Sequence, residues 1–110
     1  MAVFELRSYA LPSHNREHLY DRFRTDTTRI FTRLGFQVVG FWTVSIGPGE
    51  GDLVYLLRWD SATQRQEKWQ QFAVDEEWRR VRETTNTKHG SLVSATHSTL
   101  LTATDFSPLQ

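Results

Sequence analysis

The sequence predicts an α+β fold, in which a four-stranded antiparallel sheet carries helices on one face. Strand-like and helix-like segments follow one another in the order β-α-β-β-α-β along the 110 residues. The helix-like segments carry apolar stripes, which are typical of helices that cover a sheet. Residues 4–9, 40–48 and 54–59 are apolar on both sides, so neither face of the sheet suits contact with water.

The first predicted strand begins close to the N-terminus. Phe4 and Leu6 point to one face, whereas Glu5, Arg7 and Tyr9 point to the other. The strand therefore has one apolar face and one polar-aromatic face.

A long amphipathic helix is predicted over residues 13–34. Pro12 ends the strand over residues 3–11, Ser13 offers an N-cap, and Gly35 offers a left-handed end. Apolar residues recur at near-helical spacing, namely Leu19, Phe23, Ile30, Phe31 and Leu34. This stripe is expected to cover the sheet.

Residues 36–45 and 53–59 predict two strands joined by a turn, because both are rich in β-branched and aromatic residues. Residues 47–51, with the sequence GPGEG, supply glycines for the positive φ angles of a turn. A phosphate-binding loop is a poorer interpretation, because no Lys-Ser/Thr follows and the loop leads into a strand.

The second helical region is predicted in two pieces that bend near Ala73. Ser61 and Gln64 have the spacing of a capping box, and Asp75 favours a fresh helix start. Gly90 marks the helix exit. Trp69 and Phe72 lie on one stripe of the first piece, at helical spacing.

A last strand within residues 91–104 completes the order of a ferredoxin-like β-α-β-β-α-β sandwich. We expect the face that carries Tyr55, Leu57 and Trp59 to lie away from the helices and to need a cover. Burying each large apolar side chain contributes about 1.5–3 kcal/mol, so self-association is favoured. The expected assembly is a homodimer, a dimeric α/β barrel whose two sheets face each other.

Composition limits the classes of function. The length predicts one domain, residues 1–110, and the lack of cysteine excludes disulfides and thiolate chemistry. Thirteen basic and thirteen acidic residues cancel, so nucleic acid is not an expected partner. No apolar run approaches a membrane span, and strand-like sequence from Val3 onward leaves no room for a signal peptide. We therefore expect a cytoplasmic protein with no membrane partner.

Four short motifs carry a resemblance to the NIPSNAP family, within the dimeric α/β-barrel group. They are FELRSY at residues 4–9, GFW with IGP at residues 40–48, DEEW at residues 75–78 and FSPL at residues 106–109. The resemblance implies a homodimeric barrel with helices outside. Two positions depart from the family pattern: Tyr55 stands where a histidine is expected, and Leu57 where an aromatic residue is common.

The resemblance implies no single activity. NIPSNAP proteins lack a settled molecular activity, and the wider barrel group includes cofactor-free monooxygenases, haem-binding proteins, lactone isomerases and polyketide cyclases. Fold analogy therefore leaves the function to be argued from the residues.

The string HNREH at residues 14–18 has the spacing of an inverted zinc-peptidase motif. Both histidines lie off the apolar stripe of their helix, and no third ligand is marked downstream. A solvated first turn explains the string better, so we predict no metal site. No cofactor is predicted either.

Two interpretations of the face with Glu5, Arg7 and Tyr9 stay open. If this face points into the dimer interior, its charges need partners, and an ion-pair network satisfies them. Alternatively, Arg7 binds a substrate carboxylate and Tyr9 donates a proton. In the first interpretation, a ligand site belongs under the helices.

Two functions follow from these residues. The first is a homodimer of undefined activity that binds a small apolar or aromatic ligand. The second is a cofactor-independent monooxygenase or cyclase, in which Tyr9 or Tyr55 acts with His97 on a phenolic or polyketide-like substrate held by Trp42 and Trp59.

Overall fold

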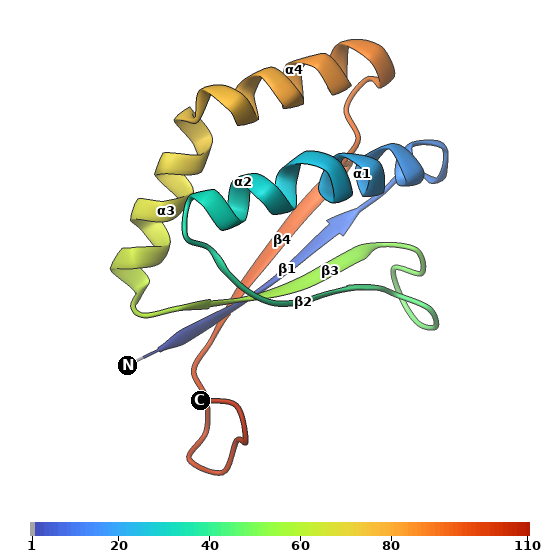
Figure 1. Ribbon diagram of the computed structural model, residues 1–110. Helices are drawn as coiled ribbons and strands as arrows, with labels where there is room; N and C mark the ends of the chain where they lie inside the picture. Colours follow the sequence, from blue (N-terminus) through green and yellow to red (C-terminus); the bar gives the residue numbers. More distant parts are fainter. Residues whose placement is uncertain (1) are drawn as a thin grey trace.

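The computed structural model describes residues 2–110, and its strands form a single antiparallel sheet with helices above it (Figure 1). The strands are β1 (Val3–Ala10), β2 (Gln37–Thr43), β3 (Leu53–Trp59) and β4 (Ala95–Leu101). Their spatial order is β2-β3-β1-β4, with antiparallel pairing throughout. This arrangement confirms the predicted α+β class with a four-stranded antiparallel sheet.

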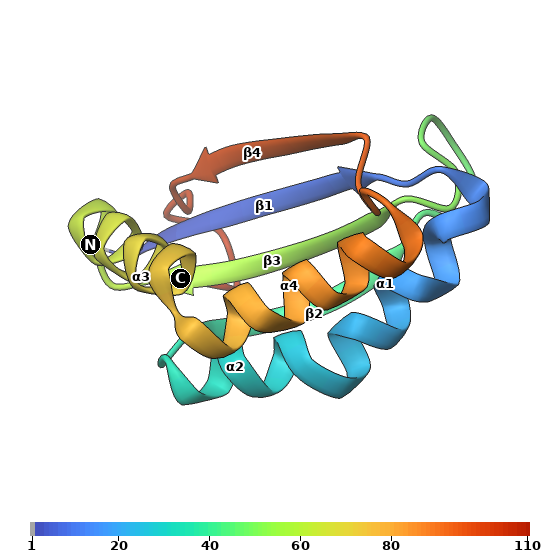
Figure 2. The ribbon, with the colours of Figure 1, turned by 90° about the horizontal axis from the view of Figure 1, so that it is seen from above.

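The helices lie on one face of the sheet in two runs. The first run consists of η1 (Ser13–Asn15), α1 (Arg16–Arg22), the π-helical turn η2 (Phe23–Thr27) and α2 (Thr28–Arg33). The second run consists of α3 (Ala62–Val74) and α4 (Glu76–His89). Figure 2 shows β4 at the edge of the sheet, beyond the helices, and every residue of β4 is exposed.

The second helical run begins and bends where its polar residues predict. The Ser61 hydroxyl accepts a hydrogen bond from the Gln64 backbone N–H at 3.0 Å. Asp75 caps α4 by accepting from the Trp78 backbone N–H at 3.0 Å. The bend falls at Asp75, two residues beyond the predicted position at Ala73, because Asp75 itself is extended, with ψ of 126°.

The first run is less regular than the single long helix that its pattern predicts. Ser13 lies inside η1 and gives no side-chain cap, because Pro12 occupies the N-cap position. The helix widens at η2, where the Thr28 hydroxyl donates to the Phe23 carbonyl at 2.9 Å, five residues back. Gly35 ends the run with a φ of 83°, as predicted.

The loop of the hairpin between β2 and β3 has the conformation that its glycines predict. Gly47, Gly49 and Gly51 have φ values of 122°, 79° and 89°, a region that L side chains rarely adopt. The Gly51 backbone N–H donates to the Val44 carbonyl at 2.8 Å and closes the loop. This segment is a turn between strands, as predicted.

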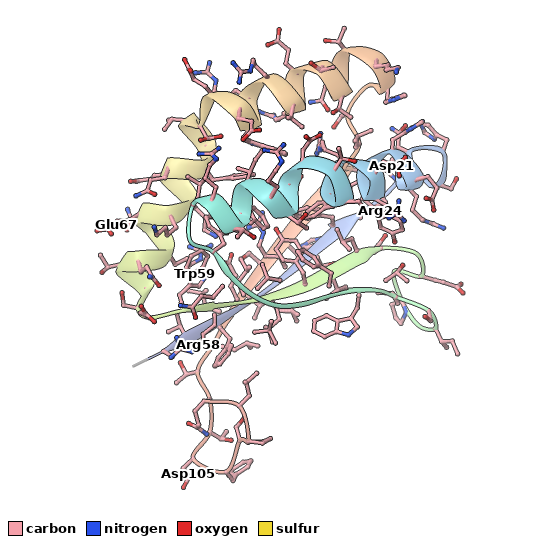
Figure 3. The ribbon with its side chains drawn as sticks, in the orientation of Figure 1. Asp21, Arg24, Arg58, Trp59, Glu67 and Asp105 are labelled. Atoms are coloured by element: carbon pink, nitrogen blue, oxygen red, sulfur yellow. The ribbon has the colours of Figure 1, made fainter. Side chains whose placement is uncertain are left out.

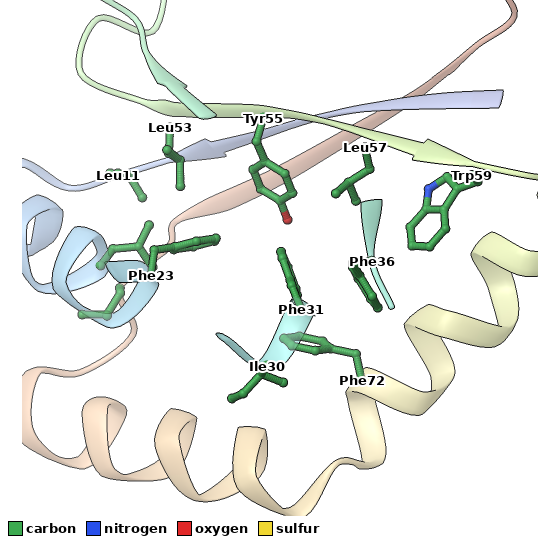
Figure 4. Close-up of a cluster of buried hydrophobic side chains, with 12 residues drawn as sticks. Leu11, Phe23, Ile30, Phe31, Phe36, Leu53, Tyr55, Leu57, Trp59 and Phe72 are labelled. Carbon is green, nitrogen blue, oxygen red and sulfur yellow. The ribbon is translucent and has the colours of Figure 1, made fainter. Parts of the chain in front are cut away.

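The strand register shows which side chains share a face. Glu5 pairs with Leu57 and Arg7 with Tyr55, so these four side chains point the same way. Tyr55 and Leu57 are fully buried, and Figure 4 shows them, with Trp59, directed at the side chains of the helices. The expectation that this set lies away from the helices is therefore wrong.

The reason for this reversal is the environment of Glu5. Strand alternation separates two sets of side chains but does not say which set faces the helices. The acidic and basic residues of β1 suggested an outward face, yet α3 supplies hydrogen-bond donors to Glu5 from Arg65 and Trp69. A buried carboxylate is tolerated when such partners satisfy it.

The core is an aromatic cluster between the sheet and the helices. Its buried members are Leu11, Leu19, Phe23, Ile30, Phe31, Phe36, Leu53, Tyr55, Leu57, Trp59, Phe72 and Leu92. Phe31 lies in its centre, with ring centroids 4.5 Å from Phe36, 5.2 Å from Phe72 and 6.1 Å from Tyr55. Aromatic packing thus holds the helices on the sheet.

The opposite side of the sheet, here called the open face, carries Leu6, Trp42, Leu56 and Leu101. Leu6 pairs with Leu56, Gly40 pairs with Leu56, and Trp42 follows Gly40 by two residues. Trp42 is 53% exposed, Leu101 41% and Leu6 38%. Within residues 2–110 the helices all lie on the other side of the sheet (Figure 1).

None of the helices in the described part of the chain has the length and apolar character needed to span a membrane.

Candidate functional site

The carboxylate of Glu5 is the centre of a polar network under the helices. The side chain is fully buried, and Trp59 and Trp69 each donate an indole N–H to Oε1 at 2.9 Å. Arg65 donates to Oε2 at 2.9 Å, and the Ser98 hydroxyl donates to the same oxygen. Donors from β3, α3 and β4 therefore meet at one carboxylate of β1.

This network keeps Glu5 ionised. Burial alone would raise the pKa of the Glu5 carboxyl, but hydrogen bonds from Arg65, Ser98, Trp69 and Trp59 lower that pKa from 4.5 to about 2. Glu5 is therefore a fixed negative charge at neutral pH, and it is unsuited to proton exchange there.

Arg7, Tyr9 and Tyr55 form a second, adjoining group. The Arg7 Nε donates to the Tyr55 hydroxyl at 3.0 Å, and Nη2 donates to the Tyr9 hydroxyl at 3.2 Å. The two hydroxyls are 2.7 Å apart. The guanidinium also lies over the Trp69 ring at 4.3 Å and pairs with Glu5 at 3.4 Å. Partners within the protein thus surround Arg7, which favours the network interpretation of this residue.

The environment sets the protonation of these groups. Burial raises the pKa of Tyr55 well above 10, and the neighbouring Tyr9 raises it further. Burial lowers the pKa of Arg7, but the hydroxyls of Tyr55 and Tyr9 outweigh that effect and raise it. Tyr55 is consequently a neutral phenol at physiological pH, able to hydrogen bond but not to serve as a base.

The structure brings some of the predicted site residues together and separates others. Arg7, Tyr9 and Tyr55 are in hydrogen-bond contact. His97 pairs with Ser8 and so points to the face opposite the tyrosines, on the exposed edge strand. The proposed partnership of His97 with Tyr9 or Tyr55 therefore has no geometric basis within the chain.

The two predicted substrate-binding tryptophans also lie apart. Trp59 is 1% exposed on the helix-facing side, beside α3 in Figure 3, and its indole N–H is engaged by Glu5. Trp42 belongs to the open face and to the rim of a hollow of about 250 Å³ at the β2 edge. One small ligand does not reach both rings of the same chain.

A cavity of about 370 Å³ lies beside Tyr9, between η2, α4 and the segment that leads into β4. Its apolar wall consists of Phe23, Phe31, Phe72, Trp78, Leu92, Val93 and Ala95. Its charged and amide side chains are Arg22, Arg82 and Asn86. Only Tyr9 among the six predicted site residues lines it.

Arg22 is the unusual member of this wall. Its Nε and Nη1 atoms are buried, with no hydrogen-bond partner among residues 2–110. The guanidinium lies 5.0 Å from the centre of the Trp78 ring. Burial lowers the pKa of Arg22, and the positive charge of Arg82 contributes in the same direction, whereas Tyr9 raises it. Sequence reasoning missed Arg22 and Arg82, because no short spacing joins two residues from different helices.

One histidine of the 14–18 string packs against a histidine of α4. His18 stacks on His89, with ring centroids 3.5 Å apart and planes 12° from parallel. Burial lowers the pKa of His89, and the charges of His18 and Lys88 lower it further. In the described ranges, no group of three or more His, Asp or Glu side chains is arranged to hold a metal ion.

Fold and cavity together define a ferredoxin-like α+β domain with an aromatic-walled space between helices and sheet. The family model named NIPSNAP matches residues 4–108, and the chain belongs to the NIPSNAP family. A search of curated proteins found no match.

Solved structures share this fold. A NIPSNAP family protein from Agrobacterium tumefaciens has a TM-score of 0.87 and 22% identity, with 100% of both chains covered. A NIPSNAP domain protein from Burkholderia xenovorans has a TM-score of 0.82 and 18% identity, covering 96% of this chain and 98% of the other. A putative antibiotic biosynthesis monooxygenase from Nitrosomonas europaea has a TM-score of 0.62 and 9% identity, covering 94% and 98%. At these identities the likeness shows the fold alone.

Proposed function

We propose that the protein is a homodimer that binds a small, partly aromatic molecule in the cavity between helices and sheet. The observation that carries this proposal is the cavity itself. Its volume of about 370 Å³ lies within the usual range of small-molecule sites, and aromatic rings form much of its wall. The lining residues Ser91, Ser94 and Thr96 are exposed, so the cavity is open to solvent along this segment and a ligand can enter there.

The cavity is testable with a neutral aromatic probe, 3-phenylpropanamide. Saturable binding at millimolar concentration is expected, with one site per protomer and NMR shifts concentrated at the residues of the wall. Thr96→Phe is expected to abolish these shifts, because Thr96 lines the cavity and a phenyl ring would occupy it.

Thr87→Phe on α4 is the matched control, since Thr87 is exposed and outside the cavity wall. Binding that survives Thr96→Phe unchanged would show that the probe binds elsewhere and would contradict the assignment of this cavity.

The open face supports the homodimer. Leu6, Trp42 and Leu101 leave a third or more of their surface exposed on a sheet face without helices. A second copy is the occupant we propose, because the same apolar side chains on both partners make the face self-complementary, and the formal net charge is zero. Burial of this face removes apolar area from water, which is the main driving force of association.

A second candidate function, cofactor-independent catalysis on a phenolic or polyketide-like substrate, is favoured by one observation. Tyr9 lines the cavity and hydrogen bonds to Tyr55, so its hydroxyl has an oriented partner. The fold likeness to a putative antibiotic biosynthesis monooxygenase agrees with this candidate without establishing it. Conversion of a phenolic substrate by the wild type and its loss in Tyr9→Phe, measured by mass spectrometry, are the expected results of this function. Equal conversion by the two proteins would contradict it.

A further inference from the structure

The charged side chains of the cavity wall are all positive. Arg22 on α1 and Arg82 on α4 both contribute to it, and the wall contains no aspartate or glutamate. Two guanidinium groups therefore face the same space without an acidic partner there. In a protein whose acidic and basic residues are equal in number, this local excess is a specific feature.

Neighbouring acidic residues do not relieve this excess. Asp21 pairs with Arg24 at 2.7 Å, and Asp26 pairs with Arg29 at 2.9 Å. Arg22 lies in the same stretch of helix but takes part in no ion pair within the described chain, and neither does Arg82. The acidic residues Asp21 and Asp26 thus pair with exposed arginines, whereas Arg22, which lines the cavity, has no acidic partner.

The unmatched group is held in place. The Arg22 guanidinium rests on Trp78 at 5.0 Å, and two of its nitrogens are buried without a partner. Burying a charge without a counter-charge costs free energy, and a bound anion would offset this cost by supplying the missing partner. Guanidinium groups bind carboxylates through paired hydrogen bonds, which a planar anion matches.

We propose that the ligand of this cavity is an organic acid whose carboxylate pairs with Arg22 and Arg82 while its aromatic or apolar body packs against Phe23, Phe31 and Phe72. This inference rests on the proposed ligand-binding function and adds the chemical class of the ligand. A single charged group with an apolar body fits a wall in which positive charge comes from one pair of side chains and aromatic rings form one side.

The probes are 3-phenylpropanoate and its neutral isostere, 3-phenylpropanamide, titrated into the full chain and followed by NMR. The acid is expected to bind about tenfold more tightly than the amide, or better, because only the acid gains charge-assisted hydrogen bonds. Arg22→Met and Arg82→Gln are expected to remove this preference while retaining amide binding. Arg79→Met, one turn before Arg82 on α4 and outside the cavity wall, is expected to leave both affinities unchanged.

A second measurement is the melting temperature of ligand-free Arg22→Met. Its value is expected to rise, because methionine keeps contact with Trp78 and removes an unmatched buried charge. A fall would show that Arg22 is a structural residue and would overturn the inference.

The outcomes separate the two proposals. Equal affinities for acid and amide would overturn the organic-acid inference and leave the ligand-binding function standing. Failure of both probes to shift any resonance of the cavity wall would overturn the ligand-binding function and the inference with it. An acid preference that persists in both arginine variants would place the anion elsewhere and would also overturn the inference.

Discussion

Glu5→Gln is expected to lower the free energy of unfolding by about 3–5 kcal/mol, because it removes one partner from a buried ion pair. Glutamine has the same shape, yet its amide turns a donor toward groups that are themselves donors. Those groups include Arg65 at 2.9 Å and the indole N–H groups of Trp59 and Trp69. Urea unfolding followed by tryptophan fluorescence and circular dichroism measures the change.

Glu67→Gln is the control for this substitution. Glu67 lies on the same helix as Arg65 and is exposed, and Figure 3 shows it directed away from the sheet. Its effect is expected to stay within about 0.5 kcal/mol. Equal stability losses in the two variants would show that the Glu5 network contributes nothing specific.

The same carboxylate predicts a pH dependence. The pKa of Glu5 is about 2 in the folded protein against an ordinary value of 4.5, so the unfolded chain takes up its proton first as the pH falls. The stabilisation is complete above about pH 4.5 and is lost between there and about pH 2, amounting to about 3 kcal/mol. Glu5→Gln is expected to lack this portion of the acid-unfolding curve.

Leu6→Glu is expected to convert a dimer into a monomer. Leu6 lies on the central strand β1, next to Leu56 on the open face, and in a two-fold interface each substitution counts twice. Losing about 2 kcal/mol of apolar burial in each copy raises the dissociation constant by about a thousandfold, before any cost of burying the charge. Light scattering coupled to size-exclusion chromatography measures the mass in solution.

Val74→Glu makes the same change of chemistry outside the open face. Val74 is 69% exposed at the end of α3, on the helix side of the sheet, so this variant is expected to remain dimeric. A wild-type protein that is monomeric at micromolar concentration would contradict the proposed dimer directly. A Leu6→Glu variant that stays dimeric would place the interface on another surface.

The sequence predicted the order of the elements and several of their ends, because local chemistry decides them. Gly35 supplies the left-handed exit, Ser61 caps α3, and Asp75 caps α4. Each of these signals acts over a few residues, so it can be recognised without knowledge of the rest of the chain.

The orientation of the sheet was not predictable in the same way. Alternation grouped Glu5 with Arg7 and Tyr9 correctly, but the polar residues suggested a face away from the helices. The donors that make the inward orientation favourable, Arg65 and Ser98, lie 60 and 93 residues further along the chain. A buried charge cannot be distinguished from an exposed one until its distant partners are known.

The residues of the candidate site were also only partly predictable from the sequence. Tyr9 was identified because it stands in a recognisable strand motif, whereas Arg22 and Arg82 stand in ordinary surface-like helical sequence. Their place in the proposed site comes from the packing of α1 beside α4 and from the absence of an acidic side chain between them in the cavity wall. Neither condition can be recognised from a local sequence pattern.

The π-helical turn η2 has a consequence for the chain lengths that this fold tolerates. Residues 23–27 hold one residue more than an α-helical path needs, and the Thr28 hydroxyl binds the Phe23 carbonyl across the widened turn. Deletion of that extra residue would leave a regular α-helical path and keep the faces of α1 and α2 in register. A further inserted residue would instead rotate α1 relative to α2 by about 100°, the step of one helical residue. Either Arg22 would then leave the cavity or Phe31 would leave the core. We therefore expect insertions to be tolerated in the hairpin loop and rejected in this turn, and a single deletion to be tolerated in both.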